Sequence, residues 1–171
     1  AGFIGSSLII KLLDYENYSI INLDKFGYAS DLTNIELKLK TLKSSKYEYH
    51  KVDLCDYKKT LKIVKNTKPD IVFHLAAETH VDRSINKPFS FVNSNIMGTY
   101  NLLQAILEYW NSLTSDNKKE FRFIHISTDE VFGSAIANKK FNEESRYAPN
   151  SPYSASKASS DLLVRSWNKT Y

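Results

Sequence analysis

AGFIGSSLIIKLLDYENYSIINLD, residues 1–24, is the stretch that decides the fold. Its opening glycine turn, residues 2–5, leads into an apolar segment at 6–13 that predicts a buried helix. The apolar run at 19–23 then predicts a short strand that ends at Asp24. A glycine turn that leads into a helix and a strand is part of an α/β unit, so we expect a further strand before the turn.

The same alternation continues to the end of the chain. Apolar or alternating runs predict strands at 47–52, 70–75 and 121–126. Helical periodicity predicts helices at 33–42, 57–65 and 89–109 and from 151 onward. Strands separated by helices build βαβ units, whose parallel sheet is covered by helices on both faces. The sequence therefore predicts an α/β fold with a Rossmann-like, doubly wound parallel sheet that is truncated at both ends.

Length and composition are those of a soluble globular protein. The chain has 171 residues, of which 42% are hydrophobic and 25% charged, enough for one domain with its own core. We expect residues 1–171 to form a single domain that lacks its first strand. No apolar run has the length of a membrane span, no signal peptide is visible, and the single cysteine, Cys55, excludes an internal disulfide. We therefore expect a cytoplasmic protein without a membrane partner.

The net charge of +4 raises the alternative of a nucleic-acid-binding protein. The lysines are scattered along the chain, whereas phosphate-binding faces concentrate their charge. We therefore expect a solvated surface and no nucleic-acid partner. An anionic small-molecule substrate would benefit from the same sign of charge.

A helix that begins in a glycine turn can bind a phosphate, because its first N–H groups lack intrahelical partners and glycine lets a pyrophosphate approach the backbone. Asp24 follows about 20 residues later, where a carboxylate accepts hydrogen bonds from an adenosine ribose and repels a 2′-phosphate. This arrangement favours NAD over NADP, although Lys25 weakens the preference. Asp53, at the end of the next strand, could hold the edge of the adenine. Capping of the helix that begins at Tyr57 is an equally favoured alternative for Asp53. The expected cofactor-binding residues here are Gly2, Phe3, Ile4, Gly5, Asp24, Lys25, Asp53, Leu54, Leu75, Ala76 and Ala77.

Tyr153 and Lys157 place a phenol and an ammonium four residues apart, on one face of an expected helix. A phenol with a pKa of about 10 is a poor base at neutral pH. The ammonium, together with the positive charge of an oxidised nicotinamide, is expected to lower that pKa and let the phenolate accept a proton from an alcohol. Lys157 can also hold the nicotinamide ribose. The alternative is a helical tyrosine beside a surface lysine.

Thr128, Asp129 and Glu130 set a hydroxyl and two carboxylates just after the strand at 121–126, where open α/β sheets bind ligands. Oxidation of an alcohol needs no such pair of acids, whereas an elimination does. One carboxylate can remove a proton made acidic by a neighbouring ketone, and a second, protonated carboxyl can drive out hydroxide as water. The alternative is a pair of solvated acids that cap the next helix. No metal site is expected from the histidines, because none lies at metal-ligand spacing: His74, His80 and His125.

These motifs together resemble the extended short-chain dehydrogenase/reductase family and, within it, the nucleotide-sugar 4,6-dehydratases, above all those that act on dTDP-glucose. The most specific are HLAAETHVDRS at 74–84, STDEVFG at 127–133 and SPYSASKASSD at 151–161. The opening AGFIG and LDK at 23–25 match as well. The resemblance spans the whole chain. The family's first glycine and everything after Tyr171, where it builds its substrate domain, are missing, so that domain is expected downstream.

The resemblance implies an NAD-dependent hydro-lyase that converts dTDP-glucose to the 4-keto-6-deoxy sugar. Tyr153, assisted by Thr128, takes the proton of the 4-hydroxyl while hydride passes from C4 to NAD. Glu130 removes the C5 proton, Asp129 protonates the departing C6 hydroxyl, and hydride returns to C6. The contacts implied by the resemblance are Ser94, Tyr153 and Lys157 with the cofactor, and His80, Ser84, Thr128, Asp129 and Glu130 with the sugar.

Other functions stay open from the sequence. A UDP-glucose dehydratase, or another nucleotide-sugar dehydratase or epimerase of the family, would share the fold, and the missing substrate domain would decide between the bases. A non-catalytic NAD-sensing module would have little reason to keep the hydroxyl, the two acids, the tyrosine and the lysine together. The resemblance also implies a homodimer, and the chain by itself is expected to be inactive.

Overall fold

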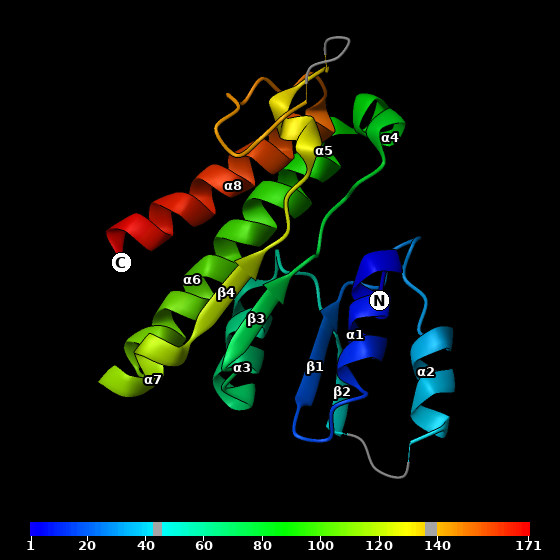
Figure 1. The fold of residues 1–171 in the computed structure, drawn as a ribbon, viewed down its shortest axis with the longest axis vertical. Coiled ribbons are helices and arrows are strands. Elements are labelled where there is room, and N and C mark those ends of the chain that lie inside the picture. The colour runs from blue at the N-terminus through cyan, green and yellow to red at the C-terminus, as the bar shows by residue number, and fades with distance from the viewer. Residues whose placement is uncertain (43–45, 136–139) are drawn as a thin grey trace. The chain divides into compact units, whose positions relative to one another are not determined.

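The computed structural model describes residues 1–42, 46–135 and 140–171. Their contacts divide the chain into two compact units, Ala1–Asp53 and Leu54–Tyr171. Each unit contains a pair of parallel strands and helices that pack with them, as Figure 1 shows. The predicted α/β fold with parallel strands is confirmed, while one domain over the whole chain stays a prediction.

The first unit is built from α1 (Phe3–Leu12), β1 (Ser19–Asp24), α2 (Thr33–Lys40) and β2 (Lys46–Lys51). β1 and β2 pair in parallel from Ser19, opposite Lys46, to Asp24, opposite Lys51. Asp24 therefore lies at the carboxyl edge of the pair. The buried core of this unit joins the first helix, β1 and α2 through Ile9, Leu13, Ile20 and Ile35.

The second unit holds the remaining elements, which are α3 (Tyr57–Thr67), β3 (Ile71–His74), α4 (Val81–Asn86), α5 (Pro88–Phe91), the π-helical η1 (Val92–Met97), α6 (Gly98–Asn111), α7 (Ser115–Glu120), β4 (Arg122–His125), the 3-10 turn η2 (Asp129–Phe132) and α8 (Pro152–Thr170). β3 and β4 pair in parallel, with His74 opposite His125 at the carboxyl end. α6 and α8 run side by side in this unit (Figure 1).

The core of the second unit lies between the β3–β4 pair and the helices α3 and α6. It is formed by Val64, Leu102, Ala105, Ile106 and Tyr109. The strands contribute Val72 and Phe123, which pack against this cluster. The alternate side chains of the same strands, Ile71, Phe73 and Ile124, are more than a third exposed, at 48%, 38% and 37%. Alternation along each strand thus packs one face of the pair against α3 and α6.

The helix expected over 89–109 begins at Pro88 and is not uniform. Its first turn is α5, and a π-helical turn at Val92–Met97 separates it from α6. Such turns insert an extra residue into a helix and are frequent at functional sites. The sequence pattern also missed α4, α7 and η2, which are too short to show clear periodicity.

Gly133 ends η2 with φ at 90°, a conformation that L side chains rarely adopt. A Cβ atom at this position would lie 2.4 Å from the carbonyl oxygen of Ala148. We expect Gly133→Ala to lower the free energy of unfolding by about 2 kcal/mol or more, measured by urea denaturation. Gly98→Ala is the control, because its Cβ would meet Leu54 Cβ at 3.4 Å, and its effect should stay within about 1 kcal/mol. Equal losses in both variants would contradict this account.

Candidate active site

Two acidic residues lie at the surface of the second unit, shortly after the end of β4. After His125 the chain stays extended to Thr128, whose φ and ψ are −145° and 148°. Thr128 caps η2, and its Oγ1 accepts a hydrogen bond of 3.3 Å from the N–H of Glu130. Asp129 and Glu130, called the acid pair below, are exposed in the first turn of η2. Of the alternative of two solvated, capping acids, the exposure to solvent is confirmed, whereas the capping is wrong, because Thr128 is the capping residue.

α8 holds Tyr153 and Lys157 on one buried face. The helix starts at a capping box, in which the side chains of Ser151 and Ser154 each accept from the other's backbone N–H. Tyr153 is in its first turn and is 7% exposed, and Lys157, one turn later, is 5% exposed. The alternative of a surface lysine is therefore wrong.

Tyr153 lies against the threonine that precedes the acid pair. Its ring packs edge-on against Phe91, with 6.3 Å between the centroids. Burial raises the pKa of Tyr153, a hydrogen bond with Thr128 opposes that effect, and the charges of Glu130 and Asp129 raise it further. The net shift of the Tyr153 pKa is upward.

Lys157 points its charge at the backbone of the strand end. Its Nζ donates a hydrogen bond of 2.6 Å to the carbonyl oxygen of Ile126. Burial lowers the pKa of Lys157, and the charge of Asp161 opposes this shift. Lys157 is not among the groups that shift the pKa of Tyr153. The predicted lowering of the Tyr153 pKa by the ammonium together with the charge of an oxidised nicotinamide stays a prediction, because these residues alone leave the ammonium on Ile126.

Asn95, in the π-helical turn, ties three segments of the site together. Its Nδ2 donates to the carbonyl oxygen of Glu78 at 2.9 Å and to Ser156 Oγ at 2.8 Å. Its Oδ1 accepts from the N–H of Glu78 at 2.8 Å. The side chain is 1% exposed, so the loop after β3 and the segment of α8 beside Lys157 are held by a buried amide that makes three hydrogen bonds.

A second buried polar cluster surrounds Asp161, one turn beyond Lys157 on α8. His125 Nε2 lies 3.0 Å from Asp161 Oδ1, and the two side chains are 7% and 11% exposed. Ser127 Oγ and the hydroxyl of Tyr147 both donate to Asp161 Oδ2, the latter at 2.9 Å. The sequence singled out neither Asp161 nor Tyr147 as a site residue. Only an acid four residues after Lys157 could have pointed to this cluster.

His74 is buried beside this cluster in its neutral form. Its Nε2 lies 2.9 Å from Thr99 Oγ1, which donates its own proton to the carbonyl oxygen of Asn95 at 2.6 Å. The Thr99 hydroxyl must therefore accept from a protonated Nε2 of His74. Burial, followed by the charges of His125 and Lys157, lowers the pKa of His74 to about 3.

The neutral His74 makes stability depend on pH. The unfolded chain takes up a proton near its ordinary pKa of about 6.5, whereas the folded chain does so only near pH 3, so stability falls as the pH drops through this window. The loss is up to about 1.4 kcal/mol per pH unit. His74→Gln keeps a donor for Thr99 and cannot titrate, so its unfolding free energy should depend less steeply on pH between about 6.5 and 4. Urea denaturation across this range tests it, and equal slopes in both proteins would contradict it.

His80 and Ser84, which were expected to contact the sugar, differ in their exposure to solvent. His80 is exposed at the start of α4, where its side chain makes no capping bond. Ser84 is 0% exposed, and its Oγ donates to the carbonyl oxygen of Val81 at 2.6 Å. A sugar would reach Ser84 only after α4 moved, so a substrate role for Ser84 stays a prediction.

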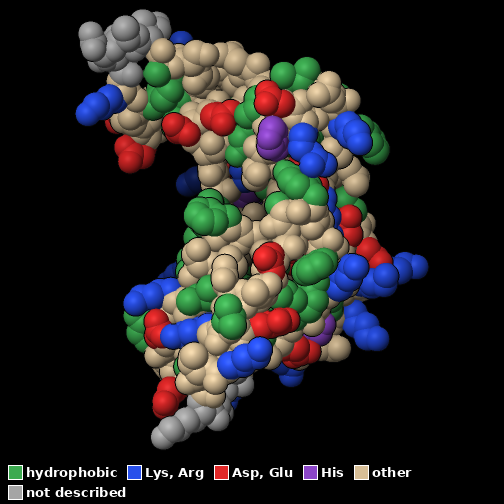
Figure 2. Space-filling model, turned by 90° about the vertical axis from the view of Figure 1, so that its right-hand side faces the viewer, with side chains coloured by type: hydrophobic (Ala, Val, Ile, Leu, Met, Phe, Trp, Pro, Cys, Tyr) green, Lys and Arg blue, Asp and Glu red, His purple; other side chains and the backbone are tan. Residues whose placement is uncertain are grey.

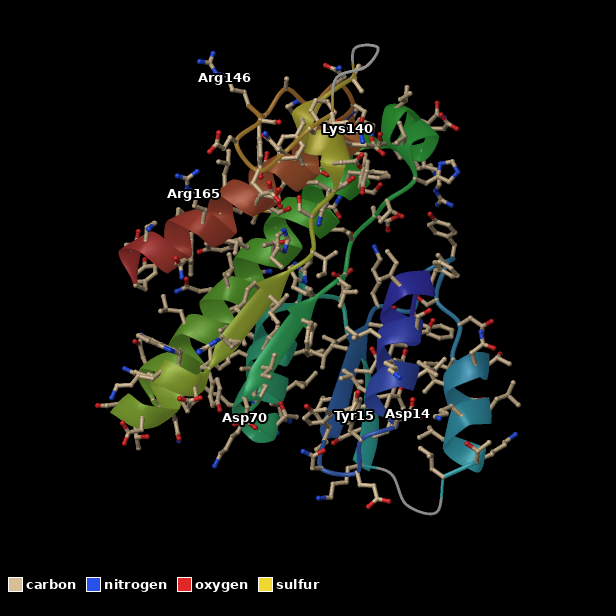
Figure 3. All side chains as sticks on the ribbon, in the orientation of Figure 1. Asp14, Tyr15, Asp70, Lys140, Arg146 and Arg165 are labelled. Carbon is tan, nitrogen blue, oxygen red and sulfur yellow. The ribbon has the colours of Figure 1, made fainter. Side chains whose placement is uncertain are left out.

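In the first unit, α1 begins without a side-chain cap at Gly2. A Cβ atom built at Gly2 or at Gly5 would meet nothing within 4 Å. Packing within this unit therefore does not require glycine, and open space borders the helix start. Phe3 and Ile4 are 88% and 63% exposed there. Asp14 and Tyr15, labelled in Figure 3, mark the opposite end of this helix. The open N-terminal turn fits a pyrophosphate.

Asp24 ends β1 as a hydrogen-bonded carboxylate. Its Oδ1 accepts from the N–H of Phe26 at 2.6 Å and from Ser30 Oγ at 2.8 Å. Burial raises the pKa of Asp24, whereas these two hydrogen bonds lower it. A charged carboxylate at this edge fits a ribose hydroxyl. Lys25, next to it, is exposed.

Asp53 does not cap α3. The cap is Asp56, whose Oδ1 accepts from the N–H of Lys59 at 3.1 Å. The capping alternative for Asp53 is therefore wrong, and its cofactor role stays a prediction. The other expected cofactor residues lie in the second unit, where Leu54 follows β2, Leu75, Ala76 and Ala77 extend from β3, and Ser94 is in η1.

The structure thus brings Thr128, the acid pair, Tyr153 and Lys157 together within one unit. A phenol, a hydroxyl, an ammonium and two carboxylates in this arrangement can carry protons to and from a sugar. Residues 1–171 match the protein family described as GDP-mannose 4,6 dehydratase. The chain belongs to this family.

Relatives within the GDP-mannose 4,6 dehydratase family bear a narrower name. The chain is 44% identical to dTDP-glucose 4,6-dehydratase of Salmonella typhimurium and 47% identical to dTDP-glucose 4,6-dehydratase 1 of Escherichia coli K12, with all of the chain and 49% of each relative covered. A solved structure of dTDP-glucose 4,6-dehydratase from Bacillus anthracis, in complex with NAD, has a TM-score of 0.81 at 33% identity, over all of the chain and 49% of that protein. The chain spans about half the length of the curated relatives it matches.

On the face drawn in Figure 2, Lys and Arg side chains of the described residues lie among Asp and Glu side chains. In the described ranges, no helix has the length and apolar character needed to cross a membrane. Among the same residues, no group of three or more His, Cys, Asp or Glu is arranged to hold a metal ion.

Proposed function

We propose that the protein containing this chain is an NAD-dependent dTDP-glucose 4,6-dehydratase, a hydro-lyase that forms a 4-keto-6-deoxy sugar. The observation that carries the proposal is the turn Thr128–Asp129–Glu130 beside the buried Tyr153 of α8. A dehydrogenase needs the tyrosine, but only an elimination needs the acid pair. The names of the relatives support the same reaction and the same nucleotide.

NAD is the proposed cofactor. Gly2 and Gly5 leave room for its pyrophosphate at the start of α1, with Phe3 and Ile4 in the same turn, and Asp24 would accept from its adenosine ribose. When bound, NAD would supply a hydride acceptor at C4 and a hydride donor at C6. The remaining residues proposed to contact NAD are Lys25, Asp53, Leu54, Leu75, Ala76, Ala77, Ser94, Tyr153 and Lys157.

Tyr153 is the proposed base for the 4-hydroxyl. The hydrogen bond from its neighbour Thr128 favours the phenolate, while burial and the acid pair disfavour it. A positive charge near the ring is therefore required to bring its pKa toward neutrality. The oxidised nicotinamide would supply that charge, and Lys157, held on Ile126, would contact the ribose.

The acid pair is proposed to carry the elimination. Once C4 is a ketone, the proton on C5 is acidic, and Glu130 removes it. Asp129 gives a proton to the C6 hydroxyl, which leaves as water, so the bonds C5–H and C6–O break and a C5–C6 double bond forms. Return of hydride to C6 and of a proton to C5 completes a cycle that consumes no net NAD. His80 and Ser84 are proposed to contact the sugar.

A second dehydratase substrate is the alternative, because the family name and the relatives point to different nucleotides. The test is to incubate the full-length protein with dTDP-glucose, UDP-glucose and GDP-mannose and to follow the product mass. We expect loss of one water from dTDP-glucose with no net formation of reduced NAD. Oxidation without water loss would refute the dehydratase activity. Preference for a sugar carrying another nucleotide would refute dTDP-glucose as the substrate.

A cytoplasmic homodimer is also part of the proposal. The homodimer is supported by apolar side chains on the outside of α6 and α8, where Tyr100 is 39% exposed and Leu162 is 57% exposed. The ring of Tyr100 packs edge-on against Trp167 at 5.9 Å between centroids, which extends this apolar strip along α8. Sedimentation of the full-length protein tests it, and a monomer at micromolar concentration would refute it.

A further inference from the structure

Asp161 receives contacts from three side chains that lie outside its own helix. Ser127 Oγ and the Tyr147 hydroxyl donate to Oδ2, and His125 Nε2 lies 3.0 Å from Oδ1. Burial alone would raise the pKa of Asp161, but the close approach of His125 and the hydrogen bonds from Ser127 and Tyr147 outweigh it and hold the pKa below its usual range. The carboxylate is therefore ionised and held from three directions at neutral pH.

The contacts of Asp161 with Ser127 and Tyr147 connect it to the two ends of the segment at 128–133, which carries the acid pair. Ser127 directly precedes Thr128, the cap of η2. At the other end, the ring of Tyr147 packs edge-on against Phe132, the last residue of η2, with 5.5 Å between the centroids. Asp161 thus contacts one end directly and the other through Tyr147.

The loop that carries Tyr147 also binds the backbone of η2. The N–H of Ala148, the next residue, donates to the carbonyl oxygen of Val131 at 2.9 Å. Val131 is 1% exposed, so this side of η2 is packed. Arg165, labelled with Arg146 in Figure 3, lies one turn beyond Asp161 on α8, and its charge acts on Tyr147. The loop is therefore held along α8 around Asp161.

Asp161 lies on the same helix as Tyr153, the proposed base for the 4-hydroxyl, and Lys157, the proposed contact of the nicotinamide ribose. Tyr153, Lys157 and Asp161 are spaced at successive turns of α8, so they share one face of that helix. Because Asp161 contacts the segment at 128–133 that carries the acid pair, it sets the distance of the acid pair from Tyr153.

We propose that Asp161 is a positioning residue that fixes the acid pair relative to Tyr153. This inference rests on the proposed dehydratase function for its catalytic consequence, but the positioning itself does not. Displacement of reacting groups by about 1 Å costs about a hundredfold in rate. Loss of the Asp161 carboxylate should therefore slow the elimination, which uses both acids of the displaced segment, more than the oxidation, whose base Tyr153 is held on α8.

The first test measures hydrogen exchange in the full-length protein. In Asp161→Ala, amides of residues 128–133 should exchange about fivefold faster or more, with α6 unchanged. Tyr147→Phe keeps the ring on Phe132 and loses only the hydroxyl, so it should give a smaller change in the same segment. Asp116→Asn is the matched control, since the Asp116 side chain is 91% exposed on α7. Unchanged exchange at 128–133 in Asp161→Ala would overturn the proposal.

The second test separates the two steps in single turnovers with dTDP-glucose. Asp161→Asn should slow water loss about tenfold or more while oxidation at C4, followed by absorbance of reduced NAD, slows by less than about threefold. Equal slowing of both steps, or faster exchange throughout the second unit, would mean a general structural role and overturn the proposal. If the unmodified protein turned over none of the tested sugars, the proposed function would fail, and the exchange result alone would still decide on the positioning.

Discussion

Tyr153→Phe in the full-length protein should lower turnover of dTDP-glucose about a thousandfold. The change removes only the phenolic hydroxyl, and general acid-base groups contribute about a hundredfold to ten-thousandfold. The phenyl ring would still pack edge-on against Phe91, and the capping box at Ser151 would still start α8. The variant should therefore fold normally and fail at the first step, before any reduced NAD forms.

The measurement is a steady-state assay of the 4-keto product with a parallel single turnover. Tyr15→Phe is the control, since Tyr15 is 49% exposed just beyond the end of α1, and its turnover should stay within about twofold of the unmodified protein. A Tyr153→Phe protein that still forms reduced NAD at the normal rate would show that another group removes the hydroxyl proton.

Glu130→Gln should stop the reaction after the first step. The amide cannot accept the C5 proton, so product formation should fall about a hundredfold or more. Tyr153 and Thr128 are untouched, so oxidation at C4 should proceed. Reduced NAD should then accumulate to about one equivalent per site, instead of forming and disappearing.

Stopped-flow absorbance with quenching of the product measures both steps. Glu120→Gln, at the exposed end of α7, is the control and should behave as the unmodified protein. Asp129→Asn should resemble Glu130→Gln, because the leaving hydroxide needs its proton. If Glu130→Gln lost oxidation and elimination by the same factor, Glu130 would not be the C5 base.

The strands of this chain could be predicted from the sequence because each has a distinct pattern. The apolar run before Asp24 and the apolar run before Leu75 lie where β1 and β3 are found. The π-helical turn at Val92–Met97 could not, because its local sequence fits an ordinary helix. It is fixed instead by the buried bonds of Asn95 to Glu78 and Ser156. Tertiary contacts outweigh local propensity there.

The residues of the candidate site were singled out from their spacing, and their catalytic roles stay predictions. The hydroxyl, the acid pair, the tyrosine and the lysine lie in one unit. The electrostatics could not be predicted, because spacing on a helix does not show that Lys157 turns its charge toward Ile126. The contacts of Asp161 were missed because its partners come from β4, from the residues just after it and from the loop after η2, far apart in the sequence.

The central claim is that one site oxidises C4, eliminates water across C5 and C6, and reduces C6. The most direct test is the position of deuterium in the product that the full-length protein makes from dTDP-glucose. With deuterium at C4 of the substrate, the account predicts that the label moves to C6. With unlabelled substrate in heavy water, it predicts one solvent deuterium at C5. Deuterium that stays at C4, or that returns to C4 with inverted configuration and no loss of water, would contradict the account.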